Sequence, residues 1–232
     1  MKNLAALEKE LGITMHDQNL LRQALVHRSY INEHPDFELN HNERLEFLGD
    51  AVLEIVVTEY LYFTFPDKPE GELTNLRASL VNAKMLSQVA SDLTIEDNLY
   101  LSRGEQRDGD SKARSFILAD AVEAIIGALY LDQGLEPTRR FIEQNIFSRL
   151  GVVIKNGLYV DAKSKFQEKA QEVYGVTPHY VVMSEDGPDN AKIFKVAAFI
   201  GEEKISEGTG TSKQEAQVEA AAKAIVSKGW QA

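Results

Sequence analysis

The sequence contains no cysteine among its 232 residues. A disulfide framework, a thiolate nucleophile and a zinc–thiolate site are therefore all excluded. It also lacks an apolar run long enough to span a membrane, and its short apolar start meets Glu8 and Glu10 too soon for a signal peptide. We expect a cytoplasmic protein without a membrane anchor.

Basic residues are also scarce, with 25 Lys and Arg against 36 Asp and Glu, which gives a formal net charge of -11. Taken alone, this balance argues against a nucleic-acid partner. The imbalance is uneven, because residues 1–160 hold 25 acidic and 16 basic residues, whereas residues 161–232 hold 11 and 9. A bound metal ion would neutralise part of the negative charge, or the acidic residues would lie away from the binding face. An ordinary solvated surface accounts for most of these charges.

Residues 1–150 show helical periodicity and no convincing strand. The expected helices are Leu4 to Leu11, Asp17 to His27, Asn42 to Phe63, Glu72 to Asp92, Phe116 to Tyr130 and Pro137 to Leu150. The periodicity weakens over residues 151–160, which we interpret as a linker.

Residues 161–232 differ in texture, with an amphipathic helix, three strand-like runs and an alanine-rich helix. The expected elements are a helix over Ala162 to Tyr174, strands over Tyr180 to Met183, Ile193 to Ile200 and Glu203 to Gly208, and a helix over Ser212 to Ser227. The fold prediction is therefore an all-α domain over residues 1–150, followed after the linker by a small α+β domain over residues 161–232 with the order α-β-β-β-α.

Three carboxylates, on Glu43, Glu46 and Asp50, recur at helical spacing in the stretch Asn42 to Leu53. A helix turns ~100° per residue, so they fall within roughly 60° of one another on one face. Like charges stacked in this way destabilise a helix and call for a cation. Gly49 in the same helix costs ~1 kcal/mol against alanine, which indicates that something packs closely there, such as another backbone.

A second pair of carboxylates, Asp120 and Glu123, lies in the otherwise apolar helix Phe116 to Tyr130. Burying them there is costly unless something pairs with them. If the two helices pack side by side, with Glu70 on a loop between them, their carboxylates form an all-oxygen site of the kind that suits Mg²⁺ or Mn²⁺. No histidine stands at a spacing useful for zinc or for a di-iron Glu-x-x-His bundle.

The competing interpretation is a set of ordinary surface charges paired with Arg28, Arg44 or Arg77. It explains a single Glu-x-x-Glu well, but it is disfavoured for two clusters inside the two most apolar helices of the domain. His27, in the stretch Leu25 to Tyr30, is interpreted as a hydrogen-bonded packing residue in preference to a ligand or a base.

The stretch Asn42 to Leu53 reads NERLEFLGDAVL, and three further motifs accompany it at Ala24 to Tyr30, Leu76 to Val81 and Leu118 to Ala124. In their order and separations, these motifs resemble those of bacterial ribonuclease III. Residues 161–232 are similar to the double-stranded RNA-binding domain that follows the nuclease domain in this family. The resemblance covers essentially the whole chain.

The resemblance implies a Mg²⁺-dependent endonuclease of double-stranded RNA, in which Mn²⁺ would substitute and a metal-activated water attacks the phosphodiester. Its products would have 5′-phosphate and 3′-hydroxyl ends with two-nucleotide 3′ overhangs, and its implied role is rRNA and mRNA processing. The family is a homodimer with one site per subunit. The residues carried over are the metal ligands Glu46, Asp50, Asp120 and Glu123, of which Asp50 and Glu123 are catalytic, the accessory acids Glu43 and Glu70, and Phe47, which inserts into the partner.

The resemblance also implies that the C-terminal domain reads the shape of duplex RNA from its two helices and one turn. The contacts carried over are Ser164, Gln167, Glu168, Gln171, Asn190, Ser212 and Lys213. Asn190 departs from the family pattern by replacing a groove-contacting histidine, and Gln214 and Gln217 depart from it by replacing lysines. Because lysine contacts to phosphate supply most of the non-specific affinity, we predict weaker binding with a flatter salt dependence. Asp110 and Ser111, in the loop before the second helix of carboxylates, also depart from the pattern.

Two other functions compete with the nuclease. A non-catalytic regulator that binds duplex RNA would keep this fold, but we would expect it to lack at least one member of the metal quartet, which is complete here. A metal-storage or di-metal oxidase bundle would need histidine ligands and would leave residues 161–232 unexplained. We therefore favour the nuclease.

Overall fold

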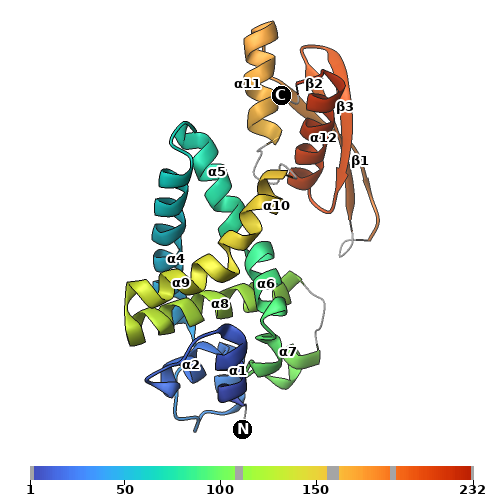
Figure 1. The fold of residues 1–232 in the computed structure, drawn as a ribbon. Coiled ribbons are helices and arrows are strands. Elements are labelled where there is room, and N and C mark those ends of the chain that lie inside the picture. The colour runs from blue at the N-terminus through green and yellow to red at the C-terminus, as the bar shows by residue number, and fades with distance from the viewer. Residues whose placement is uncertain (1–2, 108–111, 156–161, 189–191, 231–232) are drawn as a thin grey trace. The chain divides into compact units, whose positions relative to one another are not determined.

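The computed structural model describes residues 3–107, 112–155, 162–188 and 192–230. The chain divides into two compact units, Met1–Tyr159 and Val160–Ala232, each of which is described by itself (Figure 1). The first unit is built from helices, and the second from a three-stranded sheet and two helices. No helix within the described ranges is both long and apolar enough to cross a membrane.

The helices of the first unit follow one another through short connections. They are α1 (Leu4–Leu11), α2 (Gln18–Ala24), α3 (Arg28–Glu33), α4 (Glu43–Thr64), α5 (Glu70–Val81), α6 (Ala83–Asp92), α7 (Arg103–Arg107), α8 (Lys112–Gln133), α9 (Leu135–Asn145) and α10 (Leu150–Lys155), with 3₁₀ turns at Glu96–Asn98 and Phe147–Arg149. α10 carries helical structure into the stretch that the sequence predicted as a linker, and residues 156–161 lie outside the described ranges.

Local signals set several helix boundaries where the sequence predicted them. α1 ends before Gly12, whose left-handed φ of 67° suits glycine. Asp17 caps α2, because its side chain accepts a hydrogen bond of 2.9 Å from the amide of Asn19. α4 ends at Thr64, two residues before Pro66, whose ring cannot continue a helix.

The second predicted helix ends earlier than expected, at Ala24 and not at His27. Val26 leaves the helix to form a parallel bridge with Tyr100, and the His27 amide donates to the Tyr100 carbonyl at 3.1 Å. His27 then caps α3, its Nδ1 accepting from the Ser29 amide at 3.3 Å. A long-range pairing thus ends the helix, and His27 has the structural role that the sequence favoured.

The helix predicted over Glu72 to Asp92 is two helices, α5 and α6, which meet at Asn82. Asn82 has an extended backbone with a ψ of 157°, and its side-chain oxygen caps α6 by accepting from the Met85 amide at 2.9 Å. α5 begins at Glu70, so this residue is helical and does not lie in a loop as predicted. α7 likewise occupies part of the loop predicted before the second helix of carboxylates.

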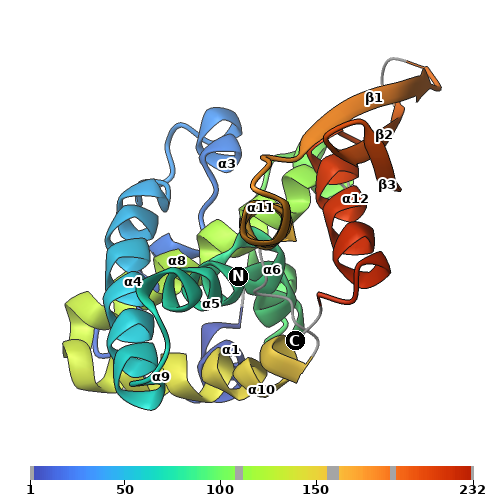
Figure 2. The same ribbon diagram turned by 90° about the horizontal axis from the view of Figure 1, so that it is seen from above.

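The core of the first unit is centred on α4 and α8, which pack against each other more extensively than any other two helices of the unit. Every apolar residue of α8 from Ile117 to Leu129 is buried, as expected for a helix that is apolar on all sides. α4 and α8 cross within the unit, and α2, α6 and α9 pack against α8 (Figures 1 and 2). The two helices that carry the clustered acids are therefore neighbours.

The second unit has the predicted order of one helix, three strands and one helix. Its elements are α11 (Ala162–Tyr174), β1 (His179–Asp186), β2 (Ile193–Ile200), β3 (Glu203–Gly210) and α12 (Lys213–Ser227). The strands form an antiparallel sheet in the order β1-β2-β3. Both helices lie on one face of this sheet, over a small core of alanines around Phe166 (Figure 2). The α+β prediction is confirmed.

The start of α12 lies against the end of β3 at a distance that requires glycine. A Cβ built on Gly208 would lie 2.3 Å from the carbonyl oxygen of Ala216, and one on Gly210 would lie 2.6 Å from the amide nitrogen of Ala216. Side chains on these strand positions would push the helix away. The first turns of α12 are therefore fixed against the sheet.

Candidate metal centre

The crossing of α4 and α8 depends on two glycines. A Cβ built on Gly49 would lie 1.7 Å from the carbonyl oxygen of Glu123, and one on Gly127 would lie 2.2 Å from the carbonyl oxygen of Leu45. Atoms in a packed interior do not approach this closely, so the two backbones meet at a distance that only glycine permits. The glycine that the sequence marked as costly thus packs against a backbone of its own chain.

This crossing brings together carboxylates that are far apart in the sequence. Glu46 and Asp50 flank Gly49 on α4, and Asp120 and Glu123 lie on the facing turns of α8. Carboxylate oxygens of Glu46, Asp120 and Glu123 lie within 4.8 Å of one another, and all three residues are partly buried. The two helices therefore pack in the way that the sequence required for these acids to converge.

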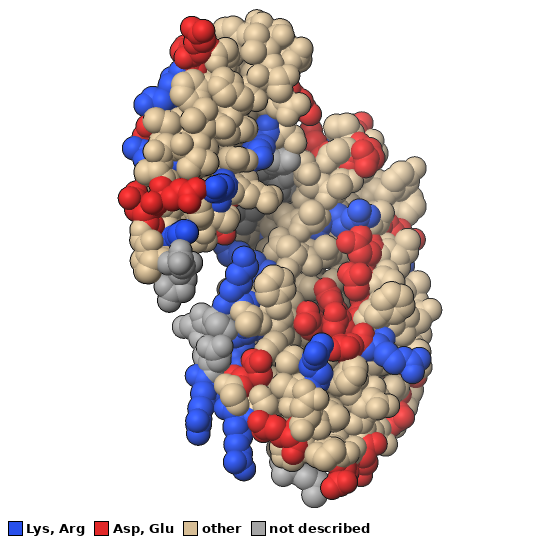
Figure 3. Space-filling model, turned by 180° about the vertical axis from the view of Figure 1, so that it is seen from behind, with Lys and Arg blue, Asp and Glu red and all other residues tan. Residues whose placement is uncertain are grey.

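The acidic row on α4 consists of Glu43, Glu46, Asp50 and Glu54. Basic side chains pair with the two ends of this row and not with its centre. Arg28 lies 3.5 Å from a carboxylate oxygen of Glu43, and Arg77 lies 2.9 Å from one of Glu54. The space-filling view shows acidic side chains gathered on one face of the first unit, with basic side chains beside them (Figure 3). Within the described ranges, neither an ion pair nor a side-chain hydrogen bond reaches the four central carboxylates, which are Glu46, Asp50, Asp120 and Glu123.

Burial and mutual repulsion raise the pKa of three of these carboxyl groups. Partial burial, followed by the charges of Asp50, Asp120 and Glu46, raises the pKa of Glu123 to about 8. Burial, followed by neighbouring carboxylates, also raises the pKa of Glu46 and of Asp120. Glu123 therefore retains its proton near neutral pH when no cation is present, and a divalent ion would displace this proton on binding.

The donor set fits a hard divalent cation. All of its members are carboxylates, the ligands that Mg²⁺ and Mn²⁺ prefer, and a bound cation would remove their mutual repulsion. Their positions are fixed by two long helices in backbone contact, which is how a preorganised site is held. His41 is placed at the edge of this region, where its Nδ1 lies 3.7 Å from Glu43, the acid at the end of the row.

The other predicted acids take different positions. Asp50 is exposed and lies outside the closest group. Burial is the largest cause of the raised pKa of Glu123, and the charge of Asp50 is the next largest. Burial is likewise the largest cause of the raised pKa of Asp120, and the charge of Glu43 is the second cause. Glu70 is not brought into the described group of carboxylates, because it begins α5, where its Oε1 accepts from the Thr74 hydroxyl at 3.0 Å.

Glu54, which was not among the predicted acids, extends the acidic row on α4. It lies one turn beyond Asp50 on α4. Burial contributes most to the raised pKa of Glu123, and the charge of Glu54 contributes least among the causes. Arg77 of α5 pairs with it and also donates to the Thr58 hydroxyl at 3.0 Å. The spacing of four residues from Asp50 was the available signal for Glu54.

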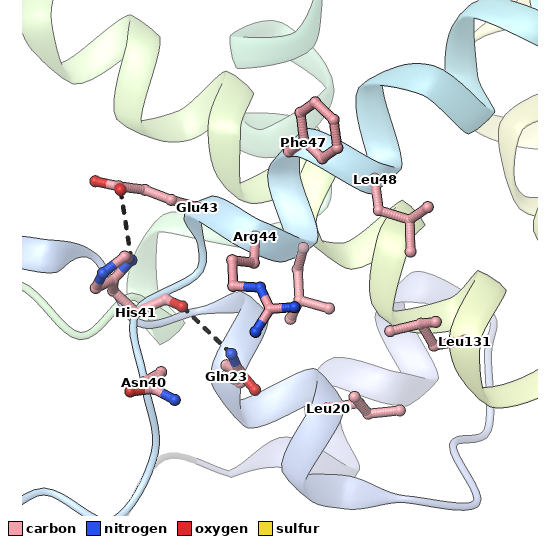
Figure 4. A pocket seen from close by; sticks show the side chains of 10 residues that line it. Leu20, Gln23, Asn40, His41, Glu43, Arg44, Phe47, Leu48 and Leu131 are labelled. Carbon is pink, nitrogen blue, oxygen red and sulfur yellow. Dashed lines mark hydrogen bonds and ion pairs between the residues drawn. The ribbon is translucent and has the colours of Figure 1, made fainter.

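Phe47 lies on the same helix but faces away from the interior, with 80% of its surface exposed. It borders a pocket of about 740 Å³, in which Leu20, Leu48 and Leu131 form an apolar wall (Figure 4). The exposed apolar side chains further along α4 are Ile55, Tyr62 and Phe63. Phe47 and these side chains leave apolar surface exposed along one side of α4.

The predicted RNA contacts of the second unit lie on α11 and at the start of α12. Ser212 caps α12 by accepting from the Glu215 amide at 3.1 Å, and Lys213 is exposed at the first helical position. The exposed polar residues of α11 include Ser164, Gln167, Glu168 and Gln171. The predicted positions that lie outside the described residues are Asn190, Asp110 and Ser111.

The chain matches two families over adjacent stretches. Residues 17–150 match the family described as Ribonuclease-III-like, and residues 162–226 match the double-stranded RNA binding motif. The chain is 43% identical over 223 residues to Ribonuclease 3 of Pelotomaculum thermopropionicum, across 96% of this chain and 92% of that protein. It is 40% identical over 224 residues to Ribonuclease 3 of Enterococcus faecalis, across 95% of each.

The first unit is also similar to a solved structure. The nuclease domain of ribonuclease III from Campylobacter jejuni aligns with 42% sequence identity and a TM-score of 0.55, across 62% of this chain and 98% of that one. A helical nuclease domain followed by a double-stranded RNA-binding domain is the class of protein that these matches define. The chain belongs to the ribonuclease III family.

Proposed function

We propose that the carboxylate cluster at the crossing of α4 and α8 binds Mg²⁺ and is the place where the chain hydrolyses phosphodiesters of double-stranded RNA. Membership of the ribonuclease III family makes the chain a double-stranded RNA endonuclease. The choice of site rests on the group of central carboxylates. Within the described ranges, no lysine or arginine side chain forms an ion pair with them. Mn²⁺ would substitute, because it accepts the same oxygen ligands.

The proposed ligands are Glu46, Asp50, Asp120 and Glu123. A divalent ion bound by them supplies an acidified water and stabilises negative charge on the phosphate. Glu123 gives up its proton when the site is filled, and Glu43 and Glu70 are the proposed accessory acids. Attack of water at phosphorus with loss of the 3′ oxygen leaves a 5′-phosphate and a 3′-hydroxyl, and we propose that the two cuts are offset to leave two-nucleotide 3′ overhangs.

Metal removal tests this proposal. Long duplex RNA incubated with the protein and Mg²⁺ is expected to be cut into short duplexes, whereas EDTA should abolish cutting and an excess of Mg²⁺ should restore it. Denaturing gels measure the cleavage, and sensitivity of the fragments to phosphatase identifies the 5′-phosphate. Cleavage that persists in EDTA would contradict a metal-dependent site.

The two competing functions are less well supported. A non-catalytic regulator has no need of four carboxylates that repel one another. Burial, followed by this repulsion, raises the pKa of Glu123. A metal-storage or oxidase bundle needs histidine ligands, and the candidate ligand group found within the described ranges contains carboxylates alone.

We further propose that the chain acts as a homodimer through the exposed apolar side of α4. Phe47 borders the pocket whose apolar wall includes Leu48 and Leu131, so a two-fold axis beside them would place Phe47 of each copy in the pocket of the other (Figure 4). The related nuclease domain from Campylobacter jejuni has a region involved in dimer formation, which supports this proposal.

Phe47→Asp is expected to convert the dimer into a monomer. A carboxylate cannot enter an apolar pocket without losing its hydration, so association should weaken by at least about a hundredfold. Light scattering coupled to gel filtration measures the mass. Val173→Asp, which makes the same kind of change at an exposed valine of α11, should leave the mass unchanged. A Phe47→Asp protein that stays dimeric would exclude this contact.

The second unit is the proposed RNA-binding module. Its exposed α11 face would contact a minor groove, and Lys213 at the start of α12 would contact phosphate. The proposed division of labour is a nuclease and dimerisation domain over residues 1–150, a linker over residues 151–160 and an RNA-binding domain over residues 161–232. The proposed setting is the cytoplasm, with precursors of rRNA and mRNA as substrates.

A further inference from the structure

Lys213 is the single lysine or arginine in the first two turns of α12, and the sheet holds its side chain. Its Nζ lies 2.7 Å from Oε1 of Glu185 on β1 and 5.5 Å from the centroid of the Phe194 ring on β2. Glu185 and Phe194 are partners in the register of these two strands. Two neighbouring strands therefore form one binding position for the ammonium group.

The packing of α12 against the sheet fixes this binding position. Phe194 pairs with Gly210 in the register of β2 and β3, and a Cβ on Gly210 would lie 2.6 Å from the amide nitrogen of Ala216. The start of α12 is therefore fixed against the same row of residues that ends in Glu185. Lys213 meets Glu185 without any movement of the helix.

The pair is nevertheless open to exchange. The side chain of Lys213 is 55% exposed and that of Glu185 is 39% exposed, and ion pairs this accessible are weak in water. A lysine ammonium is a compact charge on a flexible stem, which turns readily toward a new anion. An RNA phosphate at this place would compete with Glu185 for the ammonium, and the Glu185 carboxylate would repel it.

We propose that Glu185 masks Lys213 in the free protein and is exchanged for an RNA phosphate on binding, so that Glu185 limits both the affinity for duplex RNA and its salt dependence. This inference rests on the proposed function, in which Lys213 is a phosphate contact. Gln214 and Gln217 carry no charge at the neighbouring positions of α12, so the exchange acts on Lys213. If Glu185 served only to aim Lys213 at the RNA, its removal would weaken binding, which is the opposite sign.

The test compares duplex binding by the full chain and its Glu185→Gln variant in EDTA, where cleavage is prevented. With a duplex of about 16 base pairs, the span of one such domain, the variant is expected to bind about three- to fivefold tighter at low salt. The plot of log affinity against log salt should become steeper by about 0.9, the value for one phosphate contact, because a freed Glu185 carboxylate no longer takes up a cation when Lys213 binds the phosphate. A merely structural role of Glu185 would not move this slope.

Glu203→Gln is the matched control, because Glu203 pairs with Lys228 at the other end of α12 at 3.1 Å. It should leave both the affinity and the slope unchanged. Glu185→Gln should lose most of its gain in a Lys213→Gln background. No gain from Glu185→Gln, or an equal gain without Lys213, would overturn the masking inference alone. If Lys213→Gln by itself fails to weaken binding, the proposed phosphate contact is wrong, and the masking inference is overturned with it.

Discussion

Gly49→Ala is expected to destabilise the first unit by at least about 3 kcal/mol, enough to unfold many domains. The added carbon would lie 1.7 Å from the carbonyl oxygen of Glu123 and 2.9 Å from the amide nitrogen of Gly127. These are backbone atoms of a buried helix, so they cannot turn aside, and α4 and α8 would have to separate. Because these two helices form the centre of the unit, their separation opens its core. Urea denaturation followed by circular dichroism measures the loss.

The sign of this effect is informative, because alanine normally stabilises a helix relative to glycine by ~1 kcal/mol. Gly71→Ala on α5 is the matched control, since nothing lies within 4 Å of a Cβ built there. It should be as stable as the unmodified protein or slightly more stable. Gly127→Ala should resemble Gly49→Ala, because its added carbon would lie 2.2 Å from the carbonyl oxygen of Leu45. A Gly49→Ala protein of unchanged stability would mean that the two backbones do not meet.

Glu123→Gln is expected to slow the cleavage of duplex RNA by at least about a thousandfold, which corresponds to about 4 kcal/mol of transition-state stabilisation. The amide keeps the shape of the side chain but removes the charge that a divalent cation needs. Binding of duplex RNA should change by less than about twofold, because the predicted contacts lie in the second unit. Single-turnover cleavage with Mg²⁺ and binding with Ca²⁺ measure the two quantities separately.

Stability separates this loss from misfolding. Burial and four neighbouring carboxylates raise the pKa of Glu123, so a neutral side chain there should leave the metal-free protein at least as stable as before. Glu136→Gln makes the same chemical change on α9, where the carboxylate has Arg139 at 3.8 Å, and should cut at the normal rate. A Glu123→Gln enzyme that cuts normally would remove Glu123 from the site.

The elements that short-range chemistry determines could be predicted from the sequence. Gly12 ends α1 in a left-handed conformation and Pro66 follows the end of α4. The run of β-branched and aromatic residues over Ile193–Ile200 indicates the strand β2 without any knowledge of its partners. The early end of α2 could not be predicted in this way, because it depends on the pairing of Val26 with Tyr100, 74 residues away (100 − 26). The break at Asn82 depends on a capping hydrogen bond that competes with a continuous helix.

The candidate site was visible because it violates a local rule. Acids that repel one another at helical spacing, in helices otherwise fit for burial, indicate a site whose stability depends on something else. Their arrangement was not visible, because the register of α4 on α8 decides which acids approach most closely. That register places Asp50 outside the closest group and brings the charge of Glu54 to bear on Glu123. The pairing of Lys213 with Glu185 was hidden for the same reason, since it joins two elements through the sheet.

Metal occupancy and cleavage, measured on the same samples, test most directly whether the crossing of α4 and α8 creates the active site. Bound Mn²⁺ can be followed by electron paramagnetic resonance while the cleavage rate of a duplex RNA is recorded at each concentration. We predict that occupancy and rate rise together in the unmodified protein, and that both are lost when Glu46→Gln and Glu123→Gln are combined. Cleavage without bound metal, or full occupancy in the combined variant, would contradict the assignment.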